Sequence, residues 1–174
     1  MGCGSGFWLQ KLVGLGAKPQ NLFGIDLRSA GIAEAKQGVL RDANIEVGNA
    51  TQLAFADQRF DLVLQFAVFS SVLHGPSKHQ IASEMVRVLK PAGHIVWYDF
   101  FVDNPWNPNV RGVGKNEISD LFAFCRRHFE RVTVAPPLTR RMGRFAPLLY
   151  PALAGIKICS THYLGFFEKR SLGS

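Results

Sequence analysis

The chain opens on a glycine-rich segment, Met1-Gly2-Cys3-Gly4-Ser5-Gly6. Because glycine has no Cβ, glycines at alternate positions permit left-handed backbone conformations and a close approach of the backbone to a ligand. The following residues are apolar at positions 8, 9, 12 and 13, which predicts a helix over 7–13. The first amides of that helix would point toward a bound ligand. The segment therefore predicts a loop that holds a nucleotide-type cofactor.

A predicted strand that ends in an acidic residue follows the loop. The run 21–26 is mostly apolar and ends in Asp26, twenty residues after Gly6. In a βαβ unit, a carboxylate at this place meets the hydroxyls of a ribose. A dinucleotide loop would need glycine at Phe7, and a phosphate-binding loop would continue with Gly-Lys-Ser/Thr, so neither pattern fits. A nicotinamide oxidoreductase is kept as an alternative that Phe7 disfavours.

The observed Gly-x-Gly-x-Gly pattern resembles motif I of the class I S-adenosylmethionine-dependent methyltransferases. In that family the loop wraps the amino-acid part of the cofactor, and Asp26 matches the ribose-binding acid. The resemblance implies S-adenosyl-L-methionine as cofactor. The cofactor-binding residues that it implies are Gly2, Cys3, Gly4, Gly6, Asp26, Leu27, Asn49, Ala50 and Gln65.

Later segments match the same family in its order. The stretch 48–57 resembles the adenine-contacting segment, with Asn49 where aspartate is common; an amide oxygen can still accept from the adenine amino group. Residues 87–96 resemble the family's turn into the fifth strand, with Ala92 in place of the first glycine. The match is good over about the first hundred residues and loose beyond them.

Strands and helices alternate through position 101, which predicts an α/β fold with a Rossmann-like, doubly wound and mostly parallel sheet. We expect one methyltransferase-like domain over 1–174, with a cofactor-binding part (1–101) and a substrate-side and C-terminal part (102–174). A helix after Asn116 carries an apolar face that includes Cys125, and a C-terminal antiparallel hairpin ends the fold. The other expected elements are strands over 44–48, 60–66, 94–101, 129–135 and 163–169 and helices over 30–38 and 78–89.

Composition limits the location and the metal chemistry. The three cysteines form no Cys-x-x-Cys pair and no His/Cys metal spacing, so no metal site is expected and a reducing, cytoplasmic location is favoured. No signal peptide is visible, and no apolar run reaches bilayer length.

The net charge of +7 is concentrated in the last third of the chain. A basic patch attracts nucleic acid, acidic lipids or anionic substrates, but no nucleic-acid-binding signature accompanies it, so no nucleic-acid partner is expected. We interpret the patch as a solvated face or as a contact for phosphorylated or lipid-linked substrates at a membrane surface. Its residues are Arg126, Arg127, His128, Arg131, Arg140, Arg141 and Arg144.

Methyl transfer to an oxygen would need a general base, and the candidates at strand ends are His74 and Asp99. The Pro/Asn/Gly-rich loop 103–114 is expected to border the acceptor, with Trp106 stacking on a ring and Arg111 pairing with an anion. The string 104–112 is similar to small methyltransferases of bacterial surface-glycan synthesis. The resemblance implies a small-molecule, glycan or lipid-linked acceptor, and residues 138–158 would form a lid or a helical cover.

In this family a central strand, carrying a further acidic residue, leads into the glycine loop, and here only Met1 precedes Gly2. We consider three explanations: a shortened gene product or mis-assigned start, an excised fragment, or a variant whose sheet is completed by a partner. Open backbone edges favour weak cofactor binding or a homo-oligomer. The competing function is a non-catalytic interaction protein that keeps the methyltransferase scaffold, or a truncated inactive fragment.

Overall fold

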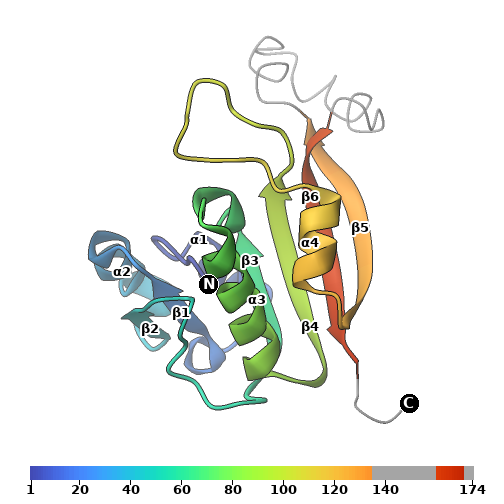
Figure 1. The fold of residues 1–174 in the computed structure, drawn as a ribbon. Coiled ribbons are helices and arrows are strands. Elements are labelled where there is room, and N and C mark those ends of the chain that lie inside the picture. Colours follow the sequence, from blue (N-terminus) through green and yellow to red (C-terminus); the bar gives the residue numbers. More distant parts are fainter. Residues whose placement is uncertain (135–159, 171–174) are drawn as a thin grey trace.

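The computed structural model describes residues 1–134 and 160–170 (Figure 1). Helices and strands alternate along the first hundred residues, as the sequence predicts, and the described part ends in two long strands. In chain order the elements are α1 (Phe7–Gly14), η1 (Pro19–Asn21), β1 (Phe23–Asp26), α2 (Ser29–Ala35), η2 (Gly38–Leu40), β2 (Asn44–Val47), β3 (Phe60–Phe66), η3 (Phe69–Ser71), α3 (Gly75–Val88), β4 (Leu89–Phe100), α4 (Lys115–Leu121), β5 (Cys125–Val134) and β6 (Ser160–Lys169).

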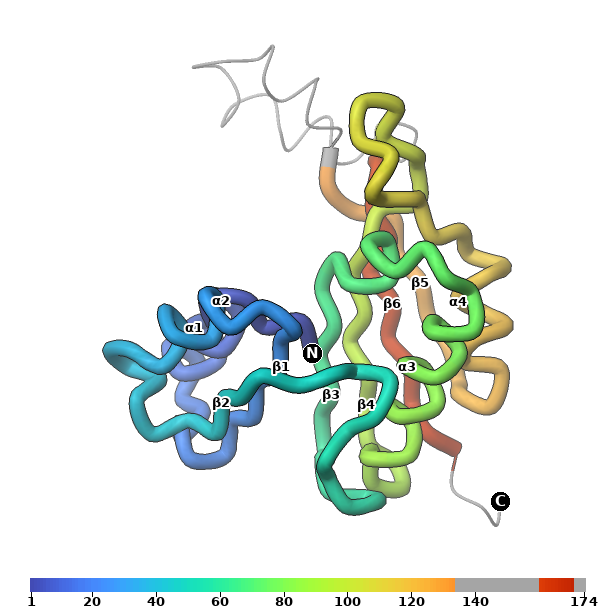
Figure 2. Tube along the Cα trace, turned by 60° about the vertical axis from the view of Figure 1, so that its left-hand side comes forward, coloured from blue at the N-terminus to red at the C-terminus, as the bar shows by residue number. Residues whose placement is uncertain are grey.

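The strands form two sheets. β1 and β2 pair in parallel, and the second sheet has the order β3-β4-β6-β5. β3 and β4 are parallel, whereas β6 runs antiparallel to both β4 and β5. Figure 2 shows the β1–β2 unit beside the four-stranded sheet, with the N-terminus between them. The α/β class and the antiparallel C-terminal strands are confirmed, but the parallel strands are divided between two sheets.

The buried apolar residues form two clusters, one mainly under each sheet, and Ile25 of β1 belongs to the larger one. The four-stranded sheet packs against α3 and α4 (Figure 1), and its largest fully buried side chains include Trp97, Phe69, Phe122 and Phe167. A smaller cluster supports the β1–β2 unit. Its buried members are Leu9, Leu22, Ile32, Ala35, Leu40 and Ile45.

Several element boundaries differ from the prediction. α3 begins at Gly75 rather than at 78, because the His74 side chain accepts a hydrogen bond from the Ser77 amide and caps the helix. β4 begins at Leu89 rather than at 94, because Leu89 already pairs with Phe60 before the register shifts. Cys125 begins β5 and is not part of the preceding helix, so its placement on that helix face was wrong.

Among the described residues, no helix is long and apolar enough to cross a bilayer. The segment 138–158, predicted as a lid or cover, lies outside the described residues.

Candidate cofactor site

The glycine loop has the backbone geometry that its composition predicts. Gly2, Gly4 and Gly6 have φ angles of +62°, +50° and +83°, in the left-handed region that other residues rarely adopt. A hydrogen bond of 2.8 Å from the Gly6 amide to the Cys3 carbonyl closes the turn. A Cβ at Gly6 would lie 2.6 Å from Leu40 Cδ1, so this glycine is also required by packing.

Asp26 ties the end of β1 to the glycine loop. Its Oδ2 accepts from the Gly4 amide at 2.9 Å, and its Oδ1 accepts from the Arg28 amide at 2.9 Å. The Arg28 guanidinium lies 3.5 Å from the same Oδ1. Partial burial opposes ionisation, but the two amides and the Arg28 guanidinium outweigh it and lower the pKa of Asp26. A carboxylate is therefore held at the loop in its ionised form.

Two further glycines allow this close approach, and the sequence analysis did not identify them. A Cβ on Gly31 in α2 would lie 3.0 Å from the Gly4 carbonyl carbon. A Cβ on Gly24 in β1 would lie 2.9 Å from Leu9 Cδ1 and 3.0 Å from Cys3 Sγ. The available signal was an isolated glycine inside a helical pattern and another inside a strand, because both mark close backbone approaches.

The remaining predicted cofactor residues follow the ends of β1 and β2. Because the two strands are parallel, Leu27 and Asn49-Ala50 lie at the same edge as Asp26. The Leu27 side chain is 71% exposed. The Asn49 Oδ1 accepts from the Thr51 amide at 3.0 Å and keeps a second lone pair for another donor.

Gln65 and Asp99 lie together at the carboxyl ends of β3 and β4, and both are fully buried. The Gln65 Nε2 donates to Asp99 Oδ2 at 3.3 Å, so the predicted cofactor residue Gln65 and the predicted base Asp99 form one pair. Desolvation raises the pKa of Asp99, against hydrogen bonds from Ser70, Gln65 and Phe100 that lower it. The roles assigned to both side chains stay predictions.

His74, the other predicted base, lies at the start of α3. Its Nδ1 accepts from the Ser77 amide at 3.3 Å and lies 2.9 Å from Ser77 Oγ. An Nδ1 that accepts requires the neutral ring to carry its proton on Nε2. His74 would therefore need a change of tautomer before it could act as a base through Nε2.

The loop 103–114 extends beyond the carboxyl end of β4 (Figure 1). Trp106 is 85% exposed, and its amide donates to Asn104 Oδ1 at 3.1 Å. The Arg111 amide donates to the Ser70 carbonyl at 2.9 Å, which joins the returning half of the loop to η3. The structure thus brings Arg111 close to the turn after β3 and leaves Trp106 in solvent.

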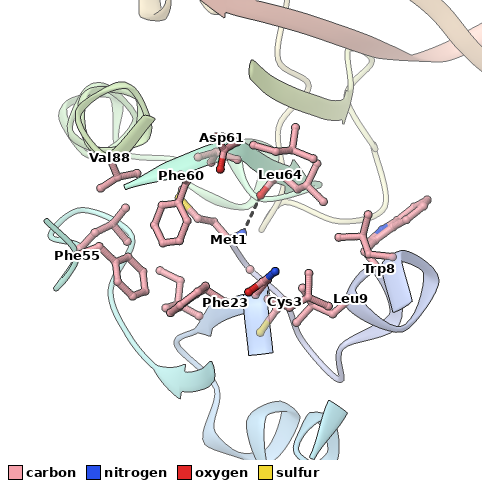
Figure 3. A pocket seen from close by; sticks show the side chains of 18 of the residues that line it. Met1, Cys3, Trp8, Leu9, Phe23, Phe55, Phe60, Asp61, Leu64 and Val88 are labelled. Atoms are coloured by element: carbon pink, nitrogen blue, oxygen red, sulfur yellow. Dashed lines mark hydrogen bonds between the residues drawn. The ribbon is translucent and has the colours of Figure 1, made fainter. Parts of the chain in front are cut away.

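An apolar cleft of about 240 Å³ separates β1 from β3. Figure 3 shows the Met1 amine in this cleft, where it donates to the Leu64 carbonyl at 2.7 Å. On the side of β1, the Cys3 amide donates to the Ile25 carbonyl at 2.9 Å. Burial lowers the pKa of the Met1 amine. Of the predicted cofactor residues, only Gly2 and Cys3 line this cleft. The predicted polar cofactor site and the apolar cleft are therefore neighbouring features that share only Gly2 and Cys3 among the predicted residues.

The described basic residues on β5 have partners within the protein. The Arg127 guanidinium donates to the Ser119 carbonyl at 2.6 Å, and that of Arg131 lies over the rings of Phe101 and Tyr163. Arg126 lies 3.8 Å from Glu168. The predicted patch members Arg140, Arg141 and Arg144 lie outside the described residues.

Comparison with known proteins gives a consistent set of relatives. The sequence model of a family described as "Methyltransferase domain" matches residues 1–97. A protein named "Methyltransferase GfsG" from Streptomyces halstedii is 30% identical over 150 residues, which cover 82% of this chain and 50% of that protein. A demethylmenaquinone methyltransferase of Bacillus mycoides is 30% identical over 98 residues, covering 54% of this chain and 40% of that enzyme.

The fold is similar to that of solved proteins as well. A SAM-dependent methyltransferase from Archaeoglobus fulgidus superposes with a TM-score of 0.72 at 14% identity, covering 97% of this chain and 83% of that one. At this identity the likeness concerns the fold alone. The chain spans half or less of the length of the two sequence relatives named above.

Proposed function

The chain belongs to the methyltransferase domain family, and from that premise we propose that it binds S-adenosyl-L-methionine and transfers its methyl group to a small acceptor. The observation that carries the proposal is the Asp26 carboxylate, which accepts from the Gly4 amide at the common edge of β1 and β2. An ionised carboxylate beside a left-handed glycine loop suits the ribose hydroxyls and the amino-acid part of this cofactor. The two sequence relatives, both methyltransferases by name, support the same reaction class, and the SAM-dependent methyltransferase from Archaeoglobus fulgidus with a similar fold supports the same cofactor.

The proposed cofactor site uses two kinds of contact. Asp26 would accept from the ribose hydroxyls through lone pairs not used by Gly4 and Arg28, because a carboxylate offers about four acceptor positions. Asn49 would accept from the adenine amino group through the second lone pair of its Oδ1. Leu27, exposed at the end of β1, would cover one face of the ribose or base with apolar surface.

The cofactor, when bound, supplies an activated methyl group on a sulfonium sulfur. Transfer of this methyl group to an acceptor atom would break the carbon–sulfur bond, leave the cofactor as a neutral thioether, and pass the acceptor's proton to a base. In this proposal the chain mainly positions the reactants and excludes water. Asp26 and the glycine loop fix one reactant, and the loop 103–114 faces the other.

We propose that the acceptor is a small molecule, a glycan or a lipid-linked molecule, and that the methylated atom is oxygen. Trp106 offers an exposed indole for stacking on a sugar or ring, and Arg111 offers a guanidinium for an anionic group. His74 would be the base after the change of tautomer described above. A membrane surface is a compatible location for such an acceptor, given the basic residues of β5.

The proposal is tested by calorimetric titration of the chain with S-adenosylmethionine and S-adenosylhomocysteine, and with NAD for comparison. We expect micromolar binding of the two sulfur nucleotides and none of NAD. Asp26→Ala removes the ribose acceptor and should weaken binding by about tenfold or more. Asp61→Ala is the matched control, because Asp61 is an exposed aspartate whose carboxylate pairs with Lys90 on the neighbouring strand.

Equal binding by the wild type and Asp26→Ala would contradict the assigned site. Absence of binding of either sulfur nucleotide would contradict the proposed function and favour the non-catalytic interaction protein. Once binding is established, transfer of a labelled methyl group from the cofactor onto phenolic, sugar and lipid-linked acceptors would test the acceptor class.

A further inference from the structure

A buried carboxylate joins two loops that the proposed reaction needs. Asp99, at the end of β4, is fully buried and accepts hydrogen bonds with both of its oxygens. Its Oδ2 accepts from the Ser70 amide at 3.1 Å and from Gln65 Nε2 at 3.3 Å, and its Oδ1 accepts from the Phe100 amide at 3.1 Å. A buried carboxylate with three donors is a costly feature that a purely structural strand end does not require.

The two residues whose amides bind Asp99 also hold the acceptor-side loop through their carbonyl groups. The Ser70 carbonyl accepts from the Arg111 amide at 2.9 Å, and the Phe100 carbonyl accepts from the Val113 amide at 2.8 Å. Both ends of this small network therefore lead from Asp99 to the returning half of the loop 103–114. If Asp99 loses either bond, the peptide that holds the loop loses its anchor.

The turn 67–71, which contains Ser70, also packs against the glycine loop. Ala67, directly after β3, has a φ of +54°, a conformation that surrounding contacts must maintain in a residue with a Cβ. This places Val68 against Gly2, where any added Cβ would overlap Val68 Cγ2. The turn 67–71 therefore touches the glycine loop on one side and the loop 103–114 on the other, and the Ser70 bond to Asp99 holds it.

We propose that Asp99 is a positioning residue: through the Ser70 amide it holds the turn 67–71, through the Phe100 amide it holds the peptide that anchors the loop 103–114, and together these bonds keep the cofactor loop and the acceptor loop in one relative arrangement. This inference rests on the proposed function, and it assigns Asp99 no contact with either reactant. It also explains why Gln65 is buried at the end of β3: its amide is the third donor to the same carboxylate. The two loops then respond together when a ligand binds to one of them.

The test uses S-adenosylhomocysteine as the probe and compares the wild type with Asp99→Asn, which keeps the shape of the side chain. The asparagine amide nitrogen then faces either the Phe100 amide or both the Ser70 amide and Gln65 Nε2, so at least one buried bond must break. At temperatures well below unfolding, we expect affinity for the probe to fall by about tenfold. Hydrogen exchange at the amides of Ser70, Arg111 and Val113 should accelerate together.

Asp61→Asn is the matched control, because it makes the same chemical change at the other end of the neighbouring strand. It should leave affinity and exchange unchanged. A second measurement needs no variant: binding of the probe to the wild type should slow exchange at the amides of Arg111 and Val113. This keeps the inference testable if Asp99→Asn does not fold.

The outcomes separate the two claims. If the wild type binds the probe, two results overturn the positioning role alone. One is that folded Asp99→Asn has the affinity and exchange rates of the wild type. The other is that the probe does not change exchange at the amides of Arg111 and Val113. Absence of wild-type binding overturns the proposed function and this inference together. Lower thermal stability of Asp99→Asn with unchanged affinity identifies a purely structural role and also overturns the inference.

Discussion

The β1–β2 unit and the four-stranded sheet differ in the size and composition of their buried cores. The four-stranded sheet buries Trp97, Phe69 and Phe167 completely, and an ion pair of 2.6 Å between the buried Lys78 and the partly exposed Glu117 joins α3 to α4. The β1–β2 unit has a small cluster of aliphatic side chains and an apolar cleft along the β3-facing edge of β1. All the predicted cofactor residues except Gln65 belong to the smaller unit or to the loops that border it. The predicted binding loops thus lie on the region with the smaller core, as is common where a segment must respond to a ligand.

The pKa shifts of two aspartates, one in each region, also differ. Asp26 and Asp99 each lie at the carboxyl end of a parallel strand and accept from backbone amides. Hydrogen bonds and Arg28 lower the pKa of Asp26, whereas desolvation raises that of Asp99. The same residue type in similar positions is therefore tuned in opposite directions by the packing of its region.

The largest effect is expected in the core of the four-stranded sheet. Trp97→Ala removes a fully buried indole and should lower the free energy of unfolding by about 3–5 kcal/mol, measured by urea denaturation. Trp106→Ala is the control, since that indole is 85% exposed and its loss should change stability by less than about 0.5 kcal/mol. Equal effects of the two substitutions would contradict the assignment of the main core to this sheet.

A methyl group in the glycine loop should have the next largest effect. Gly6→Ala imposes a left-handed conformation, about 1–2 kcal/mol, and places a Cβ 2.6 Å from Leu40 Cδ1, about 1–3 kcal/mol more. We expect binding of S-adenosylhomocysteine to be lost with it. Gly16→Ala also requires a positive φ, but nothing lies within 4 Å of its Cβ, so it isolates the conformational cost. A wild-type affinity in Gly6→Ala would show that the loop conformation does not control binding.

Filling the cleft between β1 and β3 should give the β1–β2 unit some of the support that the four-stranded sheet already has. Along a strand, the backbone carbonyls point alternately to one side and the other. The carbonyls of Ile25 and Leu64 point into the cleft, and by this alternation so do those of Leu62 and Phe66. An apolar segment of four residues added before Met1 can pair with both edges. Burial of its side chains, about 1.5–3 kcal/mol each, roughly offsets the cost of ordering it, and the new strand hydrogen bonds, about 0.5–1.5 kcal/mol each, leave an expected gain of about 1–2 kcal/mol.

Thermal unfolding measures this gain, with a Gly/Ser segment of equal length as the control. Equal stability of the two extended chains would contradict strand pairing in the cleft. A gain accompanied by tighter binding of S-adenosylhomocysteine would show that support of β1 limits the cofactor site.

The sequence predicts local features of this structure better than distant contacts. The apolar spacing of residues 8–13 predicts α1, and the strand end at Asp26 is placed correctly, because both depend on neighbouring residues. The early start of β4 depends on pairing between Phe60 and Leu89, which no local pattern contains. Gly31 is required only because the glycine loop packs on α2, so its role becomes visible only in three dimensions.

The polar side chains at strand ends were the hardest to interpret. Asp99 and His74 were both plausible bases, because a carboxylate and an imidazole at the carboxyl ends of parallel strands suit catalysis. Burial of Asp99 depends on the turn 67–71 covering it, and the cap formed by His74 depends on the helix starting at Gly75. Sequence patterns identify such residues but not the donors that surround them.

The smallest effect, and the most direct comparison of the two regions, is the titration of the two aspartates. Each carboxyl group in the unfolded chain has a pKa of about 3.9. Asp26, with its lowered pKa, contributes stability that is present above that value and is lost as the pH falls through its folded pKa. Asp99, with its raised pKa, binds its proton more tightly in the folded protein, so its contribution is present at low pH and is lost as the pH rises through its folded pKa.

Carboxyl NMR titration should therefore give midpoints on opposite sides of about 3.9, with Asp26 below and Asp99 above. Asp26→Asn and Asp99→Asn, measured by unfolding at several pH values, should remove slopes of opposite sign from the dependence of stability on pH. Midpoints on the same side would mean that desolvation does not dominate at Asp99, and hence that the turn 67–71 does not seal it from water. The same result would weaken the positioning role, because a solvated carboxylate could exchange the Ser70 and Phe100 amides for water at little cost.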